Sequence, residues 1–475
     1  MARKEKAGDV KPGHKKLVGK HAIASATGSD EIAFEVAVQP EQHARSVFDA
    51  GALPTIASLD AFRQPMGKMV ETARLLQKQG LVVHNVSDLS ISASCSKRQF
   101  ESLFRAPLVE KKMPKEGQSM ATAKTYLAPN ARVQAPQVDG LSDLIERVYV
   151  QVPPLFFAGE RPIPPFWNDK FRLRVPVDVA EIMRASAVHQ RGITGKGVRV
   201  AMADTGFYRH PYFIEQGYNF LAVTAPDALD HTTDANGHGT GECANLFATA
   251  PGINFVGVKM GANTTLAVKT ATELRPKVMT NSWGYSVDVP NSTMPNFLVP
   301  LYLAVLDAVS KGITVCFAAG NGHFAFPGSM PEVLSVGGVV VDANLAYRAT
   351  QYTSGFDSTW FPGRRTPDVC GLCGELPTAD YIVLPVQAGA ALERSGGWGA
   401  FSGTSAASPM VAGVCALLKE ADPTLTPEQV RNILKYTARD ITAGTNAHGR
   451  PAIAGPDGAT GFGLVDAARA MEVLV

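Results

Sequence analysis

Residues 401–413 have the sequence FSGTSAASPMVAG, and the expected architecture is built around them. From Ala406 to residue 418, small or apolar residues occupy every face, a pattern that predicts a helix buried inside a large domain. Pro409 has no N–H and is tolerated only in the first turn of a helix, so this helix should begin a few residues before it. Ser405 would then lie at the helix N-terminus, where backbone N–H groups and the helix dipole favour an oxyanion. Ser405 is therefore the first candidate nucleophile.

A serine acts as a nucleophile at neutral pH only when a base and a group that orients the base lie beside it. Residues 198–206 form an alternating, β-rich run that places Asp204 at the carboxyl end of a strand. Residues 236–241, NGHGTG, set His238 among glycines before another small, apolar helix start. The order Asp, His, Ser is one of three in which the catalytic triad occurs. The pattern predicts a triad of Asp204, His238 and Ser405.

Three short blocks resemble the Asp, His and Ser signatures of the subtilisin-like serine peptidases, the subtilase family. These blocks are ADTG at 203–206, GHGT at 237–240 and GTSAASP at 403–409. A fourth block, CFAAGNG at 316–322, resembles the family's oxyanion-hole segment, with Asn321 as the side-chain donor. A fifth, TNSWG at 280–284, resembles the edge strand that lines the substrate cleft. Five blocks in the family's order make the resemblance specific over about two-thirds of the chain.

The resemblance implies a serine endopeptidase that hydrolyses peptide bonds in protein or peptide substrates through an acyl-enzyme. The implied site consists of catalytic Asp204, His238 and Ser405, oxyanion donor Asn321, and substrate-binding Ser282, Trp283, Gly284, Ala319 and Gly320. Two alternatives stay open. One is a catalytically silent scaffold with the subtilisin fold, and the other is a sedolisin-type acid peptidase, which would need a Glu base in place of His238.

One residue near the histidine departs from the family pattern. Glu242 follows His238 by four residues and so lies one helical turn from it. A carboxylate that faced inward there would raise the pKa of the imidazole. We expect Glu242 to occupy a solvated surface position instead.

Short apolar runs alternate with helical segments through residues 176–475. The strand candidates are 198–204, 256–259, 277–281, 313–317 and 333–337. Such alternation predicts an α/β fold with a mostly parallel sheet and helices on both faces. Sites in these sheets lie at the carboxyl ends of strands, where Asp204, Ser282 and Asn321 all fall. We expect 176–475 to form one subtilisin-like peptidase domain.

Residues 29–112 indicate a separate, small α+β domain. Strand candidates at 32–38, 81–86 and 89–94 and helix candidates at 59–79 and 96–104 give the order β-α-β-β-α, which suggests a ferredoxin-like fold. The unit resembles the activation domains that precede secreted subtilisin-like and sedolisin-type peptidases. The implied role is an intramolecular inhibitor laid over the cleft of a zymogen; an unrelated interaction module is the alternative.

The remaining segments have linker and tail compositions. Residues 113–175 are rich in proline, which is typical of a linker, with one short helix or strand candidate at 141–150. Residues 1–28 are basic and polar and lack the apolar core of a signal peptide, so we expect a disordered tail. Without a recognisable export signal, the expected location is cytoplasmic.

Composition excludes several classes of partner. The chain has 475 residues, of which 45% are hydrophobic and 19% charged, with a formal net charge of +2. This balance favours neither a nucleic-acid nor a membrane partner, and no stretch reaches the ~18 apolar residues of a membrane span. Cys370 and Cys373 lack the second ligand pair of a zinc site, so we expect free thiols or a local disulfide. No cofactor or metal is expected; calcium binding is common in the family, but no acidic loop identifies a site.

Overall fold

The computed structural model describes residues 31–474 except 42–44, 47, 49–52, 113–124, 130–132, 134–139, 153, 157–171, 288–292 and 376–380. The basic tail expected at 1–28 lies outside the described residues. Within them, no helix is long and apolar enough to cross a membrane.

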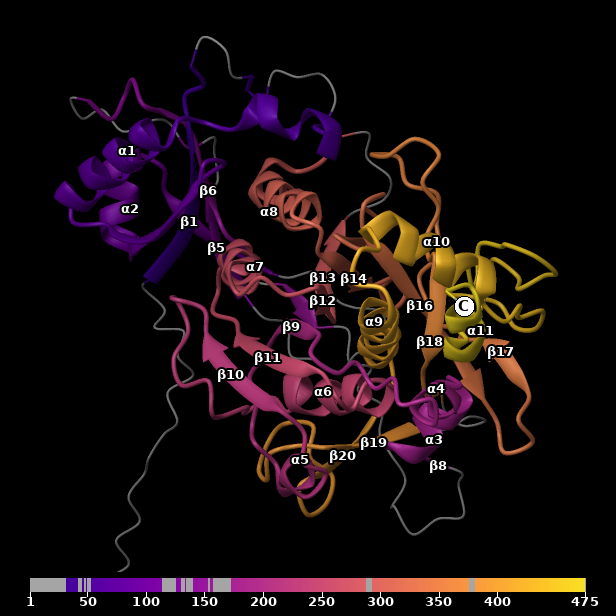
Figure 1. Ribbon diagram of the computed structural model, residues 1–475. Coiled ribbons are helices and arrows are strands. Elements are labelled where there is room, and N and C mark those ends of the chain that lie inside the picture. Colours follow the sequence, from indigo (N-terminus) through magenta and orange to yellow (C-terminus); the bar gives the residue numbers. More distant parts are fainter. Residues whose placement is uncertain are drawn as a thin grey trace, which may run out of the picture.

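The larger part of the chain builds an eight-stranded sheet (Figure 1). Its region contains β8 (Arg172–Arg174), α3 (Val177–Ile182), α4 (Ala185–His189), β9 (Arg199–Asp204), α5 (Pro211–Glu215), β10 (Phe220–Thr224), α6 (His238–Thr249), β11 (Asn254–Lys259), α7 (Thr264–Glu273), β12 (Val278–Asn281), β13 (Trp283–Val287), η2 (Asn296–Leu298), α8 (Val299–Ser310), β14 (Thr314–Ala318), β15 (Phe324–Phe326), β16 (Leu334–Val341), β17 (Tyr347–Ala349), β18 (Val369–Leu372), β19 (Tyr381–Pro385), β20 (Trp398–Phe401), α9 (Thr404–Ala421), α10 (Pro427–Thr437) and α11 (Ala467–Glu472).

The sheet has the strand order β10-β11-β9-β12-β14-β16-β17, and β18 also pairs with β16. All of these pairs are parallel except β16 with β17. Two three-stranded sheets, β15-β13-β7 and β20-β19-β8, lie outside it, and their strand β7 is Leu155–Phe156. The predicted α/β fold with a mostly parallel sheet is confirmed.

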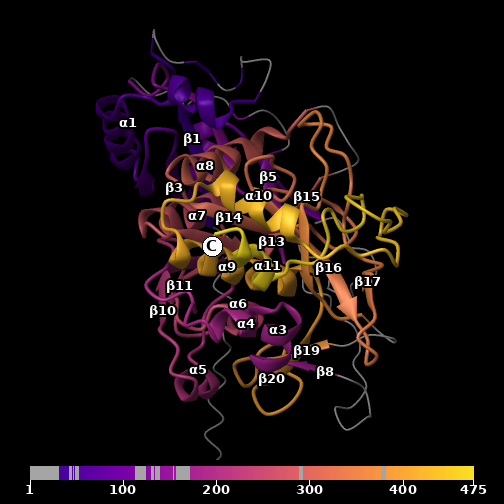
Figure 2. The ribbon, with the colours of Figure 1, turned by 45° about the vertical axis from the view of Figure 1, so that its right-hand side comes forward.

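Residues along the central strands alternate between two hydrophobic cores. Val200 and Met202 of β9 lie in the core shared with α6 and α9. Ala201 and Ala203 lie in the other core, shared with α7 and α8. Because successive side chains of a strand point to opposite faces, this division places one helix layer on each face of the sheet. Figure 2 shows the same two layers after a turn of the molecule.

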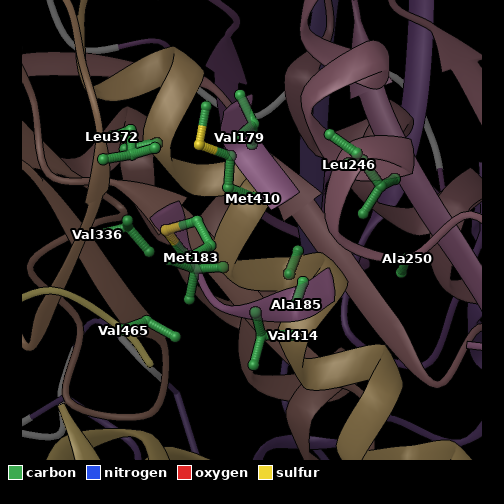
Figure 3. Packing of buried hydrophobic residues seen from close by; sticks show 14 of the residues in the cluster. Val179, Met183, Ala185, Leu246, Ala250, Val336, Leu372, Met410, Val414 and Val465 are labelled. Atoms are coloured by element: carbon green, nitrogen blue, oxygen red, sulfur yellow. The ribbon is translucent and has the colours of Figure 1, made fainter. Parts of the chain in front are cut away.

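Helices α6 and α9 pack closely on one face because both consist largely of small residues. The Thr249 hydroxyl donates to the Met410 carbonyl oxygen at 2.9 Å. A Cβ on Gly413 would lie 1.9 Å from Thr249 Oγ1, so only glycine fits where the helices approach. Figure 3 shows Met410 and Val414 of α9 surrounded by apolar side chains of other elements.

The N-terminal residues form the small domain. Its elements are β1 (Glu31–Val38), η1 (Ile56–Phe62), α1 (Met66–Lys78), β2 (Val82–Val86), β3 (Ile91–Ser96), α2 (Lys97–Phe104), β4 (Leu108–Lys112), β5 (Thr125–Pro129) and β6 (Ile145–Val150). The sheet order is β2-β3-β1-β6, with every pair antiparallel. Phe34 and Val36 of β1 face a core completed by Phe100 and Phe104 of α2.

The small domain extends beyond the boundary expected at residue 112. Strand β6 lies within the segment expected to be a linker, yet it pairs with the edge of β1 that β3 leaves open. It supplies the last strand of the βαββαβ order typical of a ferredoxin-like fold. The sequence signal was weak because the strand is short and lies among proline-rich segments.

The other face of the small sheet rests on α7 and α8, which lie between the two sheets in Figure 1. Glu35 of β1 points away from the small domain's own core and forms a buried ion pair with Lys269 of α7, with Oε2 3.1 Å from Nζ. Asn263 Nδ2 donates to Glu35 Oε1 at 3.0 Å. Lys269 also donates to the Ser90 hydroxyl at 2.8 Å. A buried, mutually satisfied polar cluster therefore joins the two domains.

We expect Gly413→Ala to destabilise the protein by about 1–3 kcal/mol, because the added methyl group overlaps Thr249 in a packed core. A lower melting temperature would show this. Gly67→Ala is the matched control: it lies in α1, where a Cβ would meet no atom within 4 Å, so its melting temperature should stay unchanged or rise slightly. Wild-type melting of Gly413→Ala would contradict the tight approach of α6 to α9.

Candidate functional site

Asp204 and His238 meet where β9 ends and α6 begins. Both side chains are fully buried, and His238 Nδ1 lies 2.7 Å from Asp204 Oδ1. The same carboxylate oxygen accepts a hydrogen bond from the Thr205 N–H at 2.7 Å. The imidazole side chain is therefore oriented by a carboxylate that is itself held by the backbone.

Glycines let the histidine loop approach the aspartate. Gly237 precedes His238 with φ 91°, in the left-handed region that favours glycine. A Cβ on Gly239 would lie 2.4 Å from the Gly206 carbonyl oxygen and 2.9 Å from Asp204 Cβ. The glycines that flank His238 are thus explained by close backbone contact with the Asp204 loop.

Asp234 organises the same loop, and the sequence analysis missed it. Its Oδ1 accepts from the Thr205 hydroxyl and the Gly237 N–H, both at 2.9 Å. Its Oδ2 accepts from the Thr240 N–H at 2.9 Å and the Thr240 hydroxyl at 2.7 Å. One buried carboxylate therefore ties the Asp204 turn to the start of α6. Its position four residues before His238, in a glycine-containing loop, was the only available signal.

Ser405 lies in the first turn of α9, after Gly403 with φ 104°. Its hydroxyl donates to the Ser282 carbonyl oxygen at 3.0 Å, and the Ser282 hydroxyl donates to the Ser405 carbonyl oxygen at 2.9 Å. The helix start is thereby fixed to the end of β12. Because β9, β12 and β14 are parallel neighbours, their carboxyl ends bring Asp204, Ser282 and the segment with Asn321 to one edge of the sheet.

Asn321 is oriented by the residue that precedes Ser405. Its Oδ1 accepts from the Thr404 N–H at 2.9 Å and from the Thr404 hydroxyl at 3.0 Å. The Thr404 hydroxyl oxygen also accepts from the Gly320 N–H at 3.1 Å. These contacts assign the Asn321 oxygen to the Thr404 side, so the amide nitrogen forms the other branch of the side chain.

The predicted substrate-binding residues contribute backbone at this edge. The Trp283 side chain is fully buried, donates from Nε1 to the Ala203 carbonyl oxygen at 2.8 Å, and packs on Phe317. Ala319 bonds through its N–H to the Val336 carbonyl oxygen at 2.8 Å, and Gly320 has φ 104°. The bulk of Trp283 therefore belongs to the core, and only its main chain is placed to meet a ligand.

The chain's own strand β7 occupies the edge of β13. Phe156 pairs with Trp283 and Leu155 pairs with Gly284 in antiparallel register. This is main-chain pairing of the kind by which an extended peptide adds a strand to a sheet edge.

Negative charge surrounds His238. Burial by itself would lower the pKa of the imidazole, but the charges of Asp204, Glu242 and Asp234 outweigh this effect and raise the pKa above its usual value of 6.5. The solvated position expected for Glu242 is wrong: the side chain is fully buried. The reason is that α6 is enclosed on every side, since all of its residues are buried.

The described residues contain no group of three or more His, Cys, Asp or Glu side chains that could hold a metal ion. All six cysteines are buried and free, including Cys370 and Cys373. Cys373 donates to the Gly403 carbonyl oxygen at 3.0 Å, and Cys370 donates to the Thr460 carbonyl oxygen at 3.4 Å. These thiols act as packing groups with local hydrogen bonds.

Comparison with known proteins places this arrangement in a family. A sequence profile described as the subtilase family, Peptidase S8, matches residues 195–463. M-protease of Shouchella clausii is 30% identical over 286 residues, covering 58% of this chain and 67% of that protein. Subtilisin BL of Lederbergia lenta is 29% identical over 286 residues, covering 58% of this chain and 95% of that protein.

A solved structure shows the same fold. Fervidolysin from Fervidobacterium pennivorans, described as a keratinolytic enzyme related to subtilisin, matches with a TM-score of 0.55 and 16% identity. The match covers 94% of this chain and 62% of the fervidolysin chain. At this identity the likeness concerns the fold alone.

The expected cytoplasmic location is corrected by these relatives. The subtilisins and alkaline proteases that this chain resembles are secreted, extracellular proteases. The expectation was based on the composition of the first 28 residues, which carries less weight than homology over more than half of the chain.

We expect Asp234→Asn to lower the free energy of unfolding by about 1–3 kcal/mol. The amide nitrogen would face two donors that the carboxylate now accepts, so buried N–H or O–H groups would lose their partner. Chemical denaturation would measure the loss. Asp230→Asn is the control from the same loop: Asp230 is exposed and has φ 49°, a conformation that asparagine adopts readily. Equal stability of the two variants would contradict the role given to Asp234.

Proposed function

The chain belongs to the subtilase family of serine peptidases, and from that premise we propose that it cleaves peptide bonds with Asp204, His238 and Ser405 as its catalytic triad. The observation that carries the proposal is the buried contact of 2.7 Å between His238 Nδ1 and Asp204 Oδ1. It orients the imidazole so that Nε2 is the nitrogen that takes part in proton transfer. Ser405 lies at the same edge of the sheet, in the first turn of α9.

The reaction proceeds in two acyl-transfer steps. Ser405 Oγ attacks the scissile carbonyl carbon while its proton passes to His238 Nε2, and Asp204 stabilises the imidazolium. The tetrahedral intermediate collapses as the C–N bond breaks and the imidazolium gives its proton to the leaving amine. Water then attacks the acyl-enzyme with His238 again as the base, which releases the carboxylic acid and restores Ser405.

Asn321 and the Ser405 N–H bind the oxyanion in this proposal. The Thr404 contacts support it, because they hold the Asn321 oxygen and so direct the amide nitrogen. The Ser405 N–H lies in the first turn of α9, where backbone donors and the helix dipole favour negative charge. Removing a side-chain donor of this kind from a subtilisin lowers turnover about 10²–10³-fold.

We further propose that the chain is an autoinhibited zymogen, with the small domain as its intramolecular inhibitor. Two contacts support this. Strand β7 pairs with Trp283 and Gly284, where an extended substrate would add its own strand. The Glu35 and Lys269 ion pair holds the small domain on α7. A substrate peptide and β7 would therefore compete for the same edge of β13.

The triad is tested with a fluorophosphonate probe, which labels only an activated serine. We expect labelling of the full chain and complete loss of labelling in Ser405→Ala. Ser408→Ala is the matched control, because Ser408 lies one turn further along α9 and contacts the Thr280 hydroxyl at 3.1 Å. Labelling that persists in Ser405→Ala, or that is lost only in Ser408→Ala, would overturn the assignment.

The docking contact gives a test of autoinhibition. Lys269→Met leaves Glu35 without its cation in a buried interface, a loss of about 3–5 kcal/mol for a buried pair. We expect the small domain to detach more often and the rate of probe labelling in the full chain to rise at least tenfold. Lys196→Met removes an exposed lysine from the turn before β9, away from this interface, and should leave the labelling rate unchanged. Equal rates in the two variants would contradict autoinhibition through this interface.

A further inference from the structure

Glu242 lies beside the catalytic imidazole on the side opposite Asp204. Its Oε1 is 4.0 Å from His238 Nε2, whereas Asp204 contacts Nδ1. Both side chains are fully buried. Oε2 accepts from Asn245 Nδ2 at 2.9 Å, one turn along the same helix face. Oε1 is buried without a hydrogen-bond partner in the described part of the chain. This oxygen therefore faces the imidazole and makes no competing hydrogen bond within the described residues.

The contact acts through charge rather than through a hydrogen bond. A separation of 4.0 Å exceeds the range of an N–H···O hydrogen bond, but two opposite charges at that distance in a water-excluded site attract strongly. Burial raises the pKa of Glu242 to about 8, although the charge of His238 and the Asn245 hydrogen bond oppose this rise. The two groups are therefore coupled, and their two titration steps belong to the pair rather than to either residue.

Other titratable groups face this pair from the surrounding elements. They are Asp204 of β9, Asp234 of the loop before α6, Cys243 of α6 and Cys373 after β18. Burial and the nearby carboxylates keep the pKa of both thiols above its usual range, so neither thiol carries charge near neutral pH. Asp204 and Asp234 remain in place when residue 242 is substituted. The effect of Glu242 on His238 can therefore be measured by changing that residue alone.

We propose that Glu242 is a positioning residue for His238, which holds the imidazole from its Nε2 side and favours its protonated form. The proposal deepens the triad mechanism and rests on the proposed function for its catalytic meaning. When Nε2 takes the Ser405 proton, the imidazolium lies between two carboxylates rather than beside one. The base is made stronger, so the unprotonated form that starts the reaction predominates only at higher pH. The acid limb of the pH profile should therefore lie at higher pH than it would without Glu242.

The direct test is an NMR titration of His238 in full-length Ser405→Ala protein labelled with ¹⁵N-histidine, which needs no catalytic activity. Adding Glu242→Gln removes the charge with little change of shape. We expect the pKa of His238 to fall by about 1 unit or more. Glu242→Asp keeps a carboxylate and should restore most of the raised pKa. Glu332→Gln removes a partly buried carboxylate near the amino end of β16, at the opposite edge of the sheet, and should leave the pKa unchanged.

The kinetic counterpart is the pH dependence of fluorophosphonate labelling with Ser405 intact. We expect the acid limb of the wild-type profile to lie above pH 6.5 and to move to lower pH in Glu242→Gln by the amount seen in the titration. An unchanged His238 pKa in Glu242→Gln would overturn the role of Glu242, and labelling of the wild type would then still support the peptidase. A lowered His238 pKa together with no labelling of the wild type at any pH would uphold the coupling and overturn the proposed function.

Discussion

The close packing of α6 against α9 is the contact on which the geometry of the site depends. His238 begins α6 and Ser405 lies in the first turn of α9, so the separation of the two helices sets where the imidazole and the hydroxyl lie. That separation is small because Gly413 presents no side chain to Thr249. A packed core resists changes of even one methyl group. A change in the packing between these helices would therefore shift the positions of His238 and Ser405 at the edge of the sheet.

Burial of the site also strengthens the electrostatic interactions between its charged groups. Asp204, Asp234 and Glu242 are all fully buried carboxylates around one imidazole. Each needs compensation, because a buried charge without partners is costly. Asp234 finds it in four donors from the backbone and two threonines. Asp204 and Glu242 find it partly in His238 itself, and this links the stability of the site to the protonation of its base.

The small domain and the segment that follows it meet the larger part of the chain through two different kinds of contact. One is main-chain pairing of β7 with β13, which a peptide of almost any sequence could replace. The other consists of two specific ion pairs. Glu35 of the small domain pairs with Lys269 of α7. Arg63 of the small domain pairs with Asp307 of α8, with Nη2 3.0 Å from Oδ1. The first kind of contact depends on backbone groups alone, whereas the second depends on which side chains are present.

Local sequence patterns were enough to predict the parallel sheet and to identify five blocks that resemble the family's signatures. Apolar runs between helical segments are local patterns, and the blocks around Asp204, His238 and Ser405 are short enough to be recognised without coordinates. Three other features became evident only in the folded chain. Glu242 was expected at the surface because a helix turn does not reveal what packs on it. The candidate element at 141–150 was assigned to a linker because its partner β1 lies more than a hundred residues away. Asp234 could not be singled out because its four donors come from the turn after β9, from Gly237 and from the first turn of α6. Local periodicity specifies which face of an element is apolar, but only the folded chain specifies which charges share a buried space.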